Sequence, residues 1–365
     1  MDRRTFLIAS ALATTGLATS RLAAAAPRHK PFEPNPANGW RTFEVTSRIQ
    51  PTAPGARVWM PLPSVEDAQW IRPMGNLWQG NYRSIQEMHD PVYKARMLVA
   101  EWDESETAPV LEVVSRVATR DRKIDFSKPG NVAPLDPATR ELYTRPTRLL
   151  PTDGIVLESS MDITQGAGND LEKARAIYEW IVDKTERNPK TRGCGVGDIR
   201  FMLESGDLSG KCADLNALYV GLARAAGLPA RDVYGVRVAD SRFGYKSLGS
   251  SGNISKAQHC RAEVWLDDFG WVPVDPADVR KVVLGEQPGL SLQDDLVIAT
   301  RKALFGSWEM NWMAYNFAHD LSLPGSARAE IPFLMYPQGE SADKRFDSLD
   351  PNNFVYSLSS REISA

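Results

Sequence analysis

Short segments in the first third of the chain alternate between apolar and polar residues, as half-buried β-strands do. Phe43, Val45 and Ile49 alternate loosely with charged and hydroxyl-bearing residues. Three further segments have the same pattern, at 56–61, 95–102 and 110–119. Turn-forming residues separate these segments, so the pattern predicts an all-β N-terminal domain over residues 39–122.

The period of the pattern changes after residues 123–161, a proline-rich stretch that predicts a connection between domains. Asn169 followed by Glu172 is typical of a capping box at the start of a helix. An apolar stripe with helical spacing follows: Leu171, Ala174, Tyr178 and Ile181. A helical region therefore begins near residue 162.

A second helix is predicted in the stretch GKCADLNALYVGLARAAGLPAR. Leu215, Leu218 and Leu222 recur at helical spacing, and Gly227 with the proline two residues later ends the pattern. Cys212 falls in the first turn of this helix. It is either a small buried residue of the core or a nucleophile, whose thiolate the positive end of the helix would stabilise.

Strands follow this helix. The segments are 232–238, 258–266 and 271–275, and the residues between the last two, Asp267 to Gly270, are typical of a hairpin turn. Helices followed by strands predict an α+β domain with an antiparallel sheet, over residues 162–284. The remaining residues, 285–365, form an aromatic-rich C-terminal extension without a clear pattern.

Composition narrows the function classes. The net charge is −3 with both signs interspersed, which argues against nucleic acid or an anionic membrane surface as a partner. Three cysteines make no disulfide framework, although a bridge between Cys194 and Cys260 stays open. The chain has no C-x-x-C, H-E-x-x-H or EF-hand motif, so we expect neither a metal nor another cofactor.

The chain begins with Arg3 and Arg4, a short apolar run and an alanine-rich end. This order is typical of a twin-arginine signal peptide, here over residues 1–26, with a proline-containing linker over 27–38. We therefore expect export by the twin-arginine machinery to the periplasm, and no association with the membrane after processing.

His259 opens a predicted strand, in which alternation places it on the face opposite Cys260. Together with Cys212 and Asp275 it makes a chemically coherent set. A thiolate attacks an acyl carbon, an imidazole keeps the thiol ionised and protonates the leaving amine, and a carboxylate orients the imidazole.

These motifs resemble the core of the transglutaminase-like superfamily. The resemblance lies in Gly210-Lys211-Cys212-Ala213-Asp214, in ARAAGLPAR, in the residues from His259 to Val264, and in GWVPVDP ending at 276. It covers about residues 165–280. It implies a papain-like fold in which the cysteine helix packs on an antiparallel sheet, with Cys212 as nucleophile, His259 as base and Asp275 as orienting group.

Two features depart from a simple version of this site. Arg261 occupies a position that is often tryptophan in the family. A symmetric hairpin would also place Asp275 opposite Ala262, roughly 10 Å along the strand from His259, so a bulge or strand twist must close the gap. Asp278 is the geometric alternative to Asp275.

The oxyanion site is only partly defined by the sequence. The backbone N–H of Cys212 is one expected donor. Trp180 and Gln258 are candidates for the second, and His319 in the tail is interpreted as structural. The function implied is a cysteine-dependent amide hydrolase or acyltransferase acting through a thioester on a peptide or protein. The alternative is a non-catalytic binding module on the same fold.

Overall fold

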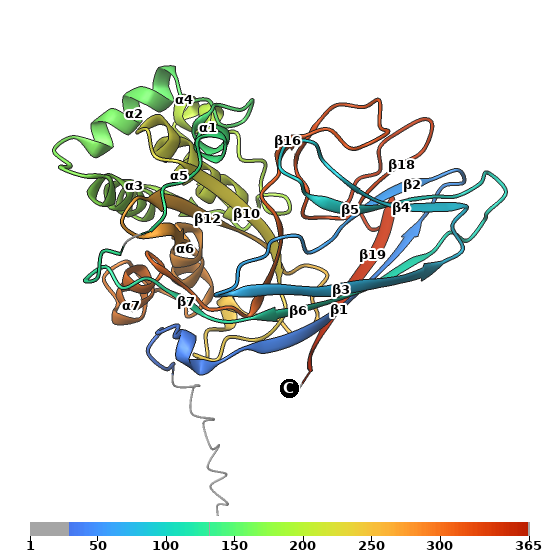
Figure 1. Cartoon of the computed structure of the whole chain (residues 1–365), viewed down its shortest axis with the longest axis horizontal. Helices are drawn as coiled ribbons and strands as arrows, with labels where there is room; N and C mark the ends of the chain where they lie inside the picture. The colour runs from blue at the N-terminus through green and yellow to red at the C-terminus, as the bar shows by residue number, and fades with distance from the viewer. Residues whose placement is uncertain (1–28, 131, 364–365) are drawn as a thin grey trace, which may run out of the picture.

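The computed structural model of the chain describes residues 29–130 and 132–363. The signal peptide expected over residues 1–26 lies outside these ranges. Within them, none of the helices has the length and apolar content that a bilayer crossing requires. Figure 1 shows the helices gathered at one end of the molecule and the long strands of the N-terminal region extending toward the other.

Two antiparallel sheets form the N-terminal β region. The first has five strands in the order β11 (Gly252–Asn253), β19 (Phe354–Ile363), β1 (Arg41–Pro51), β6 (Leu111–Thr119) and β3 (Ile71–Gly80). The second has the order β18 (Gln338–Glu340), β2 (Arg57–Pro61), β5 (Arg96–Glu101) and β4 (Ser84–His89). The apolar residues of β1 that predicted this region, among them Phe43 and Ile49, are buried.

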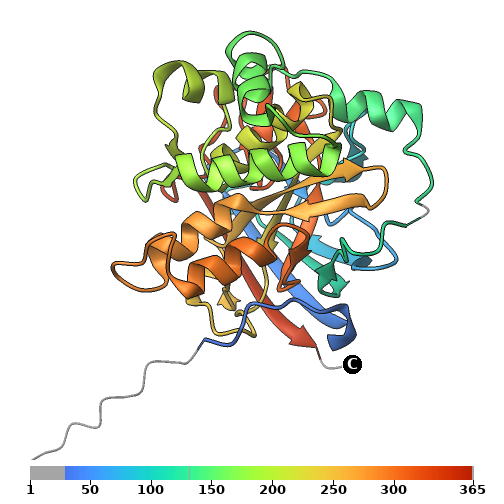
Figure 2. The same cartoon turned by 90° about the vertical axis from the view of Figure 1, so that its left-hand side faces the viewer.

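The core that follows has its own four-stranded sheet. Its order is β13 (Gly270–Val274), β12 (Gln258–Leu266), β10 (Ala230–Arg237) and β15 (Trp312–Asn316), all antiparallel. Helix α5 (Cys212–Ala225) packs on β12 and β10, and α2 (Gly154–Thr164) and α3 (Asp170–Lys184) pack on α5. Figure 2, which faces the helical end, shows helices in front of these strands. The α+β class expected from the sequence is confirmed.

Local signals explain the two central helices. The side chain of Asn169 accepts a hydrogen bond from the Glu172 backbone N–H at 2.9 Å, which is the expected cap of α3. Every residue of α5 from Cys212 to Arg224 is buried, because the helix lies between the sheet and two other helices. Most of its residues are apolar, as a helix buried on all sides requires, and its buried polar side chains, Asp214, Asn216 and Arg224, are hydrogen-bonded.

The tail contributes to both parts of the fold. Strand β15 completes the core sheet, β18 joins the second N-terminal sheet, and β19 pairs with β1 from Thr42↔Ile363 to Pro51↔Phe354. The remaining elements are α1 (Pro137–Thr144), α4 (Ile199–Ser205), α6 (Pro276–Gly285), α7 (Asp295–Ala303), two 3₁₀ turns (Pro36–Asn38 and Lys246–Leu248), β7 (Arg122–Lys123), β8 (Glu186–Arg187), β9 (Ser209–Gly210), β14 (Ser307–Trp308), β16 (His319–Leu321) and β17 (Ile331–Phe333).

Candidate active site

Cys212 is the first residue of α5, and its side chain is buried at 3% exposure. The carboxylate of Asp214 builds this helix start. It accepts hydrogen bonds of 2.9 Å from the backbone N–H groups of Lys211, Val196 and Gly197. One carboxylate thus satisfies the free N–H of the residue before the helix and ties the preceding loop to it.

Two glycines make this arrangement possible. Gly195 has φ +93°, and a Cβ there would lie 1.9 Å from the Oδ2 of Asp214. A Cβ at Gly210 would lie 2.6 Å from the same oxygen. No larger residue fits at either position without displacing Asp214 and the start of α5. Gly195 and Gly210 therefore have a packing role at the start of this helix.

All three cysteines are buried free thiols, so the structure contains no Cys194–Cys260 bridge. The Cys194 thiol donates to the carbonyl of Gln258 at 3.4 Å, and the Cys194 carbonyl accepts from the Ala213 N–H at 2.9 Å. Cys260 lies 3.9 Å from the sulfur of Met335. Cys194 is thus part of the wall around Cys212.

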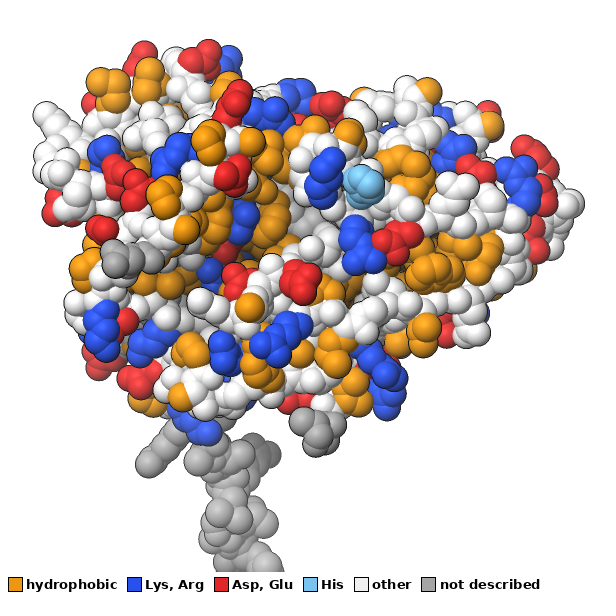
Figure 3. Space-filling view, in the orientation of Figure 1, with side chains coloured by type: hydrophobic (Ala, Val, Ile, Leu, Met, Phe, Trp, Pro, Cys, Tyr) orange, Lys and Arg blue, Asp and Glu red, His pale blue; other side chains and the backbone are white. Residues whose placement is uncertain are grey.

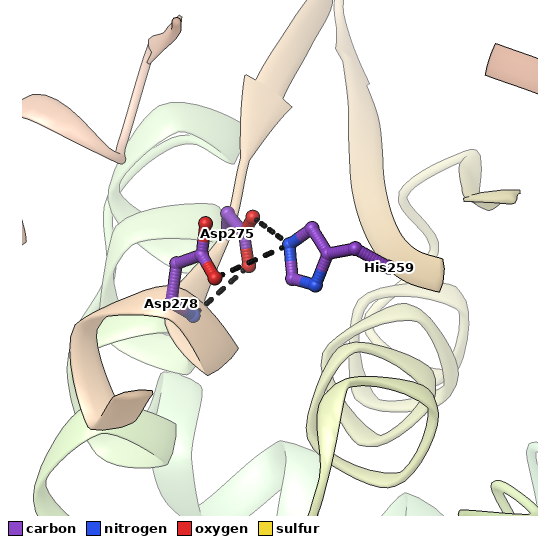
Figure 4. Close-up of side chains that lie close together, drawn as sticks. All are labelled: His259, Asp275 and Asp278. Atoms are coloured by element: carbon purple, nitrogen blue, oxygen red, sulfur yellow. Dashed lines mark hydrogen bonds and ion pairs between the residues drawn. The ribbon is translucent and has the colours of Figure 1, made fainter. Parts of the chain in front are cut away.

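His259 lies near the start of β12 and is 2% exposed. Its Nε2 is 2.7 Å from Oδ2 of Asp275 and 3.3 Å from Oδ1 of Asp278. Figure 4 shows both carboxylates on one side of the ring, with the second ring nitrogen turned away from them. The hydrogen-bonding geometry therefore assigns the proton on Nε2 to the carboxylates and leaves Nδ1 for another partner.

Asp275 reaches His259 because the chain turns out of the sheet at this residue. Strand β13 ends at Val274, which pairs with Ala262, so the expected pairing of Ala262 with Asp275 is wrong by one residue. The connecting loop is one residue longer than a symmetric two-residue turn, with Gly270 at φ +72° paired to Leu266. Asp275 is the N-cap of α6 and accepts from the Asp278 N–H at 3.1 Å.

Asp278 has a different principal partner. Both of its carboxylate oxygens are bound by Nη2 of Arg237, at 2.6 and 2.7 Å, and both residues are buried. Asp275 is therefore the nearer hydrogen-bond acceptor of His259, while Asp278 adds a second negative charge. Both aspartates named by the sequence lie beside the imidazole.

These contacts shift the pKa values of His259 and Cys212. Burial opposes protonation of His259, but the charges of Asp278 and Asp275 outweigh it and raise the pKa of His259 to about 9. The neighbouring thiols of Cys194 and Cys260, followed by His259, hold the pKa of Cys212 well below its usual value despite burial. Both shifts favour a thiolate and imidazolium pair over a neutral thiol and imidazole.

Three further buried polar residues lie around the pair. Asn216 and Arg237 were not named from the sequence, and Arg261 was named only as a departure from the family pattern. Asn216, one turn after Cys212, donates to the Cys260 carbonyl at 2.8 Å and to Oδ1 of Asp275 at 3.3 Å. Arg261 has its Nε 3.6 Å from Oδ2 of Asp275. The i+4 spacing from Cys212, and the strand alternation from His259, were the available signals for Asn216 and Arg261.

The residues His259, Asp275 and Asp278 offer ligand atoms within 4.8 Å of one another, a spacing at which side chains can bind a metal ion. The carboxylates are already neutralised, however. Arg237 binds both oxygens of Asp278, and Arg261 lies beside Asp275. A divalent cation here would have to displace buried guanidinium groups, so the cluster is better suited to holding a protonated imidazole.

Cys212 and His259 both line a pocket of about 550 Å³. Gln258 also lines it, and its buried Nε2 has no hydrogen-bond partner among the described residues. The Cys212 backbone N–H likewise has no acceptor in the described part of the chain. Trp180 packs half-buried against the core and is not among the lining residues. His319 is buried on β16 beside Asp320, at 3.2 Å.

Comparisons with known proteins identify a family model and a relative that match the chain. Residues 158–276 match the model of the transglutaminase-like superfamily. An uncharacterised protein of Haemophilus influenzae is 36% identical over 321 residues, which span 84% of this chain and 86% of that protein.

Two solved structures are also similar. A candidate cysteine protease of Cytophaga hutchinsonii has a TM-score of 0.50 at 18% identity, covering 88% of this chain and 98% of its own, which bears on the fold alone. Red sea bream transglutaminase has a TM-score of 0.28 at 11% identity, covering 85% of this chain and 60% of its own, and this supports no argument. The matched region contains the helix that begins at Cys212, the strand of His259 and the helix cap Asp275, and the chain belongs to the transglutaminase-like superfamily.

Proposed function

We propose that this protein is a cysteine-dependent amide-bond hydrolase or acyltransferase with a peptide or protein substrate, in which Cys212 is the nucleophile, His259 the acid and base, and Asp275 the orienting group. The observation that carries the proposal is the 2.7 Å contact between His259 Nε2 and Asp275, which directs Nδ1 away from the carboxylates within a pocket that Cys212 also lines.

The proposed reaction has two steps. The thiolate of Cys212 attacks the amide carbon, forming a C–S bond and an oxyanion. As the C–N bond breaks, Nδ1–H of His259 gives its proton to the leaving amine. In the second step His259 takes a proton from water, or from an amine acceptor, which attacks the thioester and releases the thiolate. The Cys212 N–H is free to stabilise the oxyanion. Gln258, with its unpartnered Nε2, is the second candidate donor.

The test is cleavage of a defined pool of N-acetylated octapeptides in H₂¹⁸O, followed by mass spectrometry. Hydrolysis should place one ¹⁸O in each new carboxyl group, and added hydroxylamine should convert part of the same acyl fragment to a hydroxamate, because both intercept a thioester. Cys212→Ala should lose both products by at least about 100-fold, while Cys194→Ser, a substitution in the pocket wall, should keep measurable cleavage. Equal cleavage by Cys212→Ala would contradict the thioester mechanism.

We also propose that the protein is exported by the twin-arginine machinery to the periplasm, on the basis of Arg3, Arg4 and the apolar run after them. Replacing both arginines with lysine should leave unprocessed protein in the cytoplasm, since the receptor reads the arginine pair. Cell fractionation and immunoblotting measure this. Normal processing of the double variant, with loss of export when the Sec pathway is blocked, would show that another route is used.

A further inference from the structure

The pocket beside Cys212 carries charges of one sign. Its charged lining residues are all basic: Arg187, Arg192, Lys211, Arg237, Lys256 and Lys281. No aspartate or glutamate is among the lining residues of this pocket. On the face of the molecule in Figure 3, by contrast, acidic and basic side chains are intermixed. The pocket is therefore electropositive in a chain whose net charge is −3.

Two of these cations form ion pairs with a carboxylate of the protein. Arg237 is bound by Asp278, and Arg192 pairs with Asp347. Within residues 29–130 and 132–363, the other four have no carboxylate at ion-pair distance: Arg187, Lys211, Lys256 and Lys281.

Two of the four lie close to the proposed nucleophile. Arg187 is on β8, where it pairs in register with Gly210, two residues before Cys212. Lys281 is on α6, one turn after Asp278, and is half-buried. Burial and the neighbouring charge of Arg237 lower the pKa of Lys281 to about 8. Placing unpaired cations together in a concave site is unfavourable in the empty protein, and a bound anion removes that cost.

We propose that the acyl compound attacked by Cys212 carries a carboxylate close to the scissile amide, and that Arg187 and Lys281 bind this carboxylate. The inference rests on the proposed function and adds its substrate class, an anionic peptide. A guanidinium presents a fork of donors that matches a carboxylate, and an ammonium adds a point charge. The volume of about 550 Å³ is in the range that holds a short peptide segment. The carboxylate is either a peptide C-terminus or an acidic side chain.

The first experiment uses two alkylating agents of nearly equal size on the full chain, iodoacetate and iodoacetamide, with Cys212 modification followed by peptide mass mapping. A cysteine-containing model peptide supplies the reference ratio of the two rates. Relative to that ratio, Cys212 should favour iodoacetate by about tenfold, since a focused positive field raises the local concentration of an anion by 10- to 1,000-fold. The preference should fall as salt is raised from about 0.01 to 1 M.

The variants separate the pocket cations from other sources of positive charge. Arg187→Gln with Lys281→Gln should remove most of the preference for iodoacetate, measured as the ratio of the two alkylation rates, and Lys281→Arg should keep the preference. Lys190→Gln is the matched control, because Lys190 is exposed, near Arg187 in the chain and not a lining residue. An undiminished preference in the double variant would assign the field to His259 and overturn the inference.

A protection experiment distinguishes the two sources of the carboxylate. N-acetyl-Ala-Ala, with a terminal carboxylate, and N-acetyl-Glu-Ala-amide, with a side-chain carboxylate, are compared with neutral N-acetyl-Ala-Ala-amide as protectants of Cys212 against iodoacetamide. At least one acidic peptide should protect at about tenfold lower concentration than the neutral one. Equal protection by all three would overturn the inference while leaving the thiol active. Failure of Cys212 to react with either reagent would instead count against the proposed function.

Discussion

At pH 6, Cys212 should react with iodoacetamide on the order of 10 to 100 times faster in the wild-type protein than in His259→Ala, since an ordinary thiol with a pKa of about 8.5 is almost wholly protonated there. The neighbouring thiols of Cys194 and Cys260, and after them the His259 imidazolium, contribute to the low pKa of Cys212. Rates of carbamidomethylation, followed residue by residue with mass spectrometry, measure this effect.

The pH dependence gives the experiment its internal control. The pKa of His259 is raised to about 9, so the imidazolium persists from acid pH to about that value and is lost above it. At pH 9.5 an ordinary thiol is also ionised, and the two proteins should then react at rates within a few-fold of each other. Similar rates at pH 6 would show that the histidine does not activate the cysteine, and the binding-module hypothesis would become the better account.

Asp275→Asn and Asp278→Asn refine this prediction. Each substitution removes one of the charges that raise the pKa of His259, so each should move the upper limit of the imidazolium window below pH 9. Asp275→Asn also loses the charge on the nearer hydrogen-bond acceptor of Nε2, at 2.7 Å. NMR titration of the His259 ring protons would follow both changes directly, and an unchanged titration midpoint would contradict the assigned electrostatics.

The helix that begins at Cys212 was predictable because its signals are local. The spacing of Leu215, Leu218 and Leu222, and the glycine after them, fix a helix that starts at Cys212. The strand of His259 was equally clear, with bounds of Gln258–Leu266 as expected. The contact between His259 and Asp275 was expected from the family resemblance, but strand pairing alone did not predict it, because it depends on the helix cap at Asp275, which turns the carboxylate back toward the sheet.

Strands β3 and β4 escaped prediction for a different reason. Strand β3 is an edge strand with most residues exposed, and its register shifts between Pro73 and Asn76. Neither face is fully buried, so no strict alternation is required of the sequence. Strands β15 and β18 of the C-terminal extension were not predicted either. They are only five and three residues long, and they pair with strands more than 70 residues away in sequence, so no local pattern marks them.

Buried charges also resist sequence analysis, because a charged residue in a strand usually predicts an exposed face. Arg237 is the last residue of β10 and Arg261 lies within β12, and both strands are almost wholly buried. The charge of Arg237 balances that of Asp278, and Arg261 lies beside Asp275. Only the three-dimensional pairing shows that these arginines serve the acidic residues beside His259.

Removing one member of the buried pair that is directly hydrogen-bonded, Arg237 and Asp278, should cause the largest loss of stability. Asp278→Asn leaves Arg237 buried, at 2% exposure, without a carboxylate on its Nη2, and should lower the free energy of unfolding by about 3–5 kcal/mol. Urea unfolding at pH 7, followed by tryptophan fluorescence and circular dichroism, measures the loss.

An exposed pair provides the control for this loss. Asp153→Asn breaks the surface pair with Arg200, in which the Asp153 side chain is 79% exposed, and should cost no more than about 1 kcal/mol. The pKa of Asp278 is held well below its usual value, by Arg237 first and His259 next, despite burial. Ionised Asp278 therefore contributes its full stabilisation above about pH 4, the pKa of an aspartate in an unfolded chain. This stabilisation is lost as the pH falls through the lower pKa that Asp278 has in the folded protein. A double variant tests the same explanation. Replacing both partners, Arg237→Met with Asp278→Leu, should recover much of the stability that Asp278→Asn loses, because no unpaired charge remains buried. If Asp278→Asn lowers the free energy of unfolding by no more than Asp153→Asn does, the pair of Arg237 and Asp278 does not hold α6 against β10. The negative charge of Asp278 would then depend on a group other than Arg237.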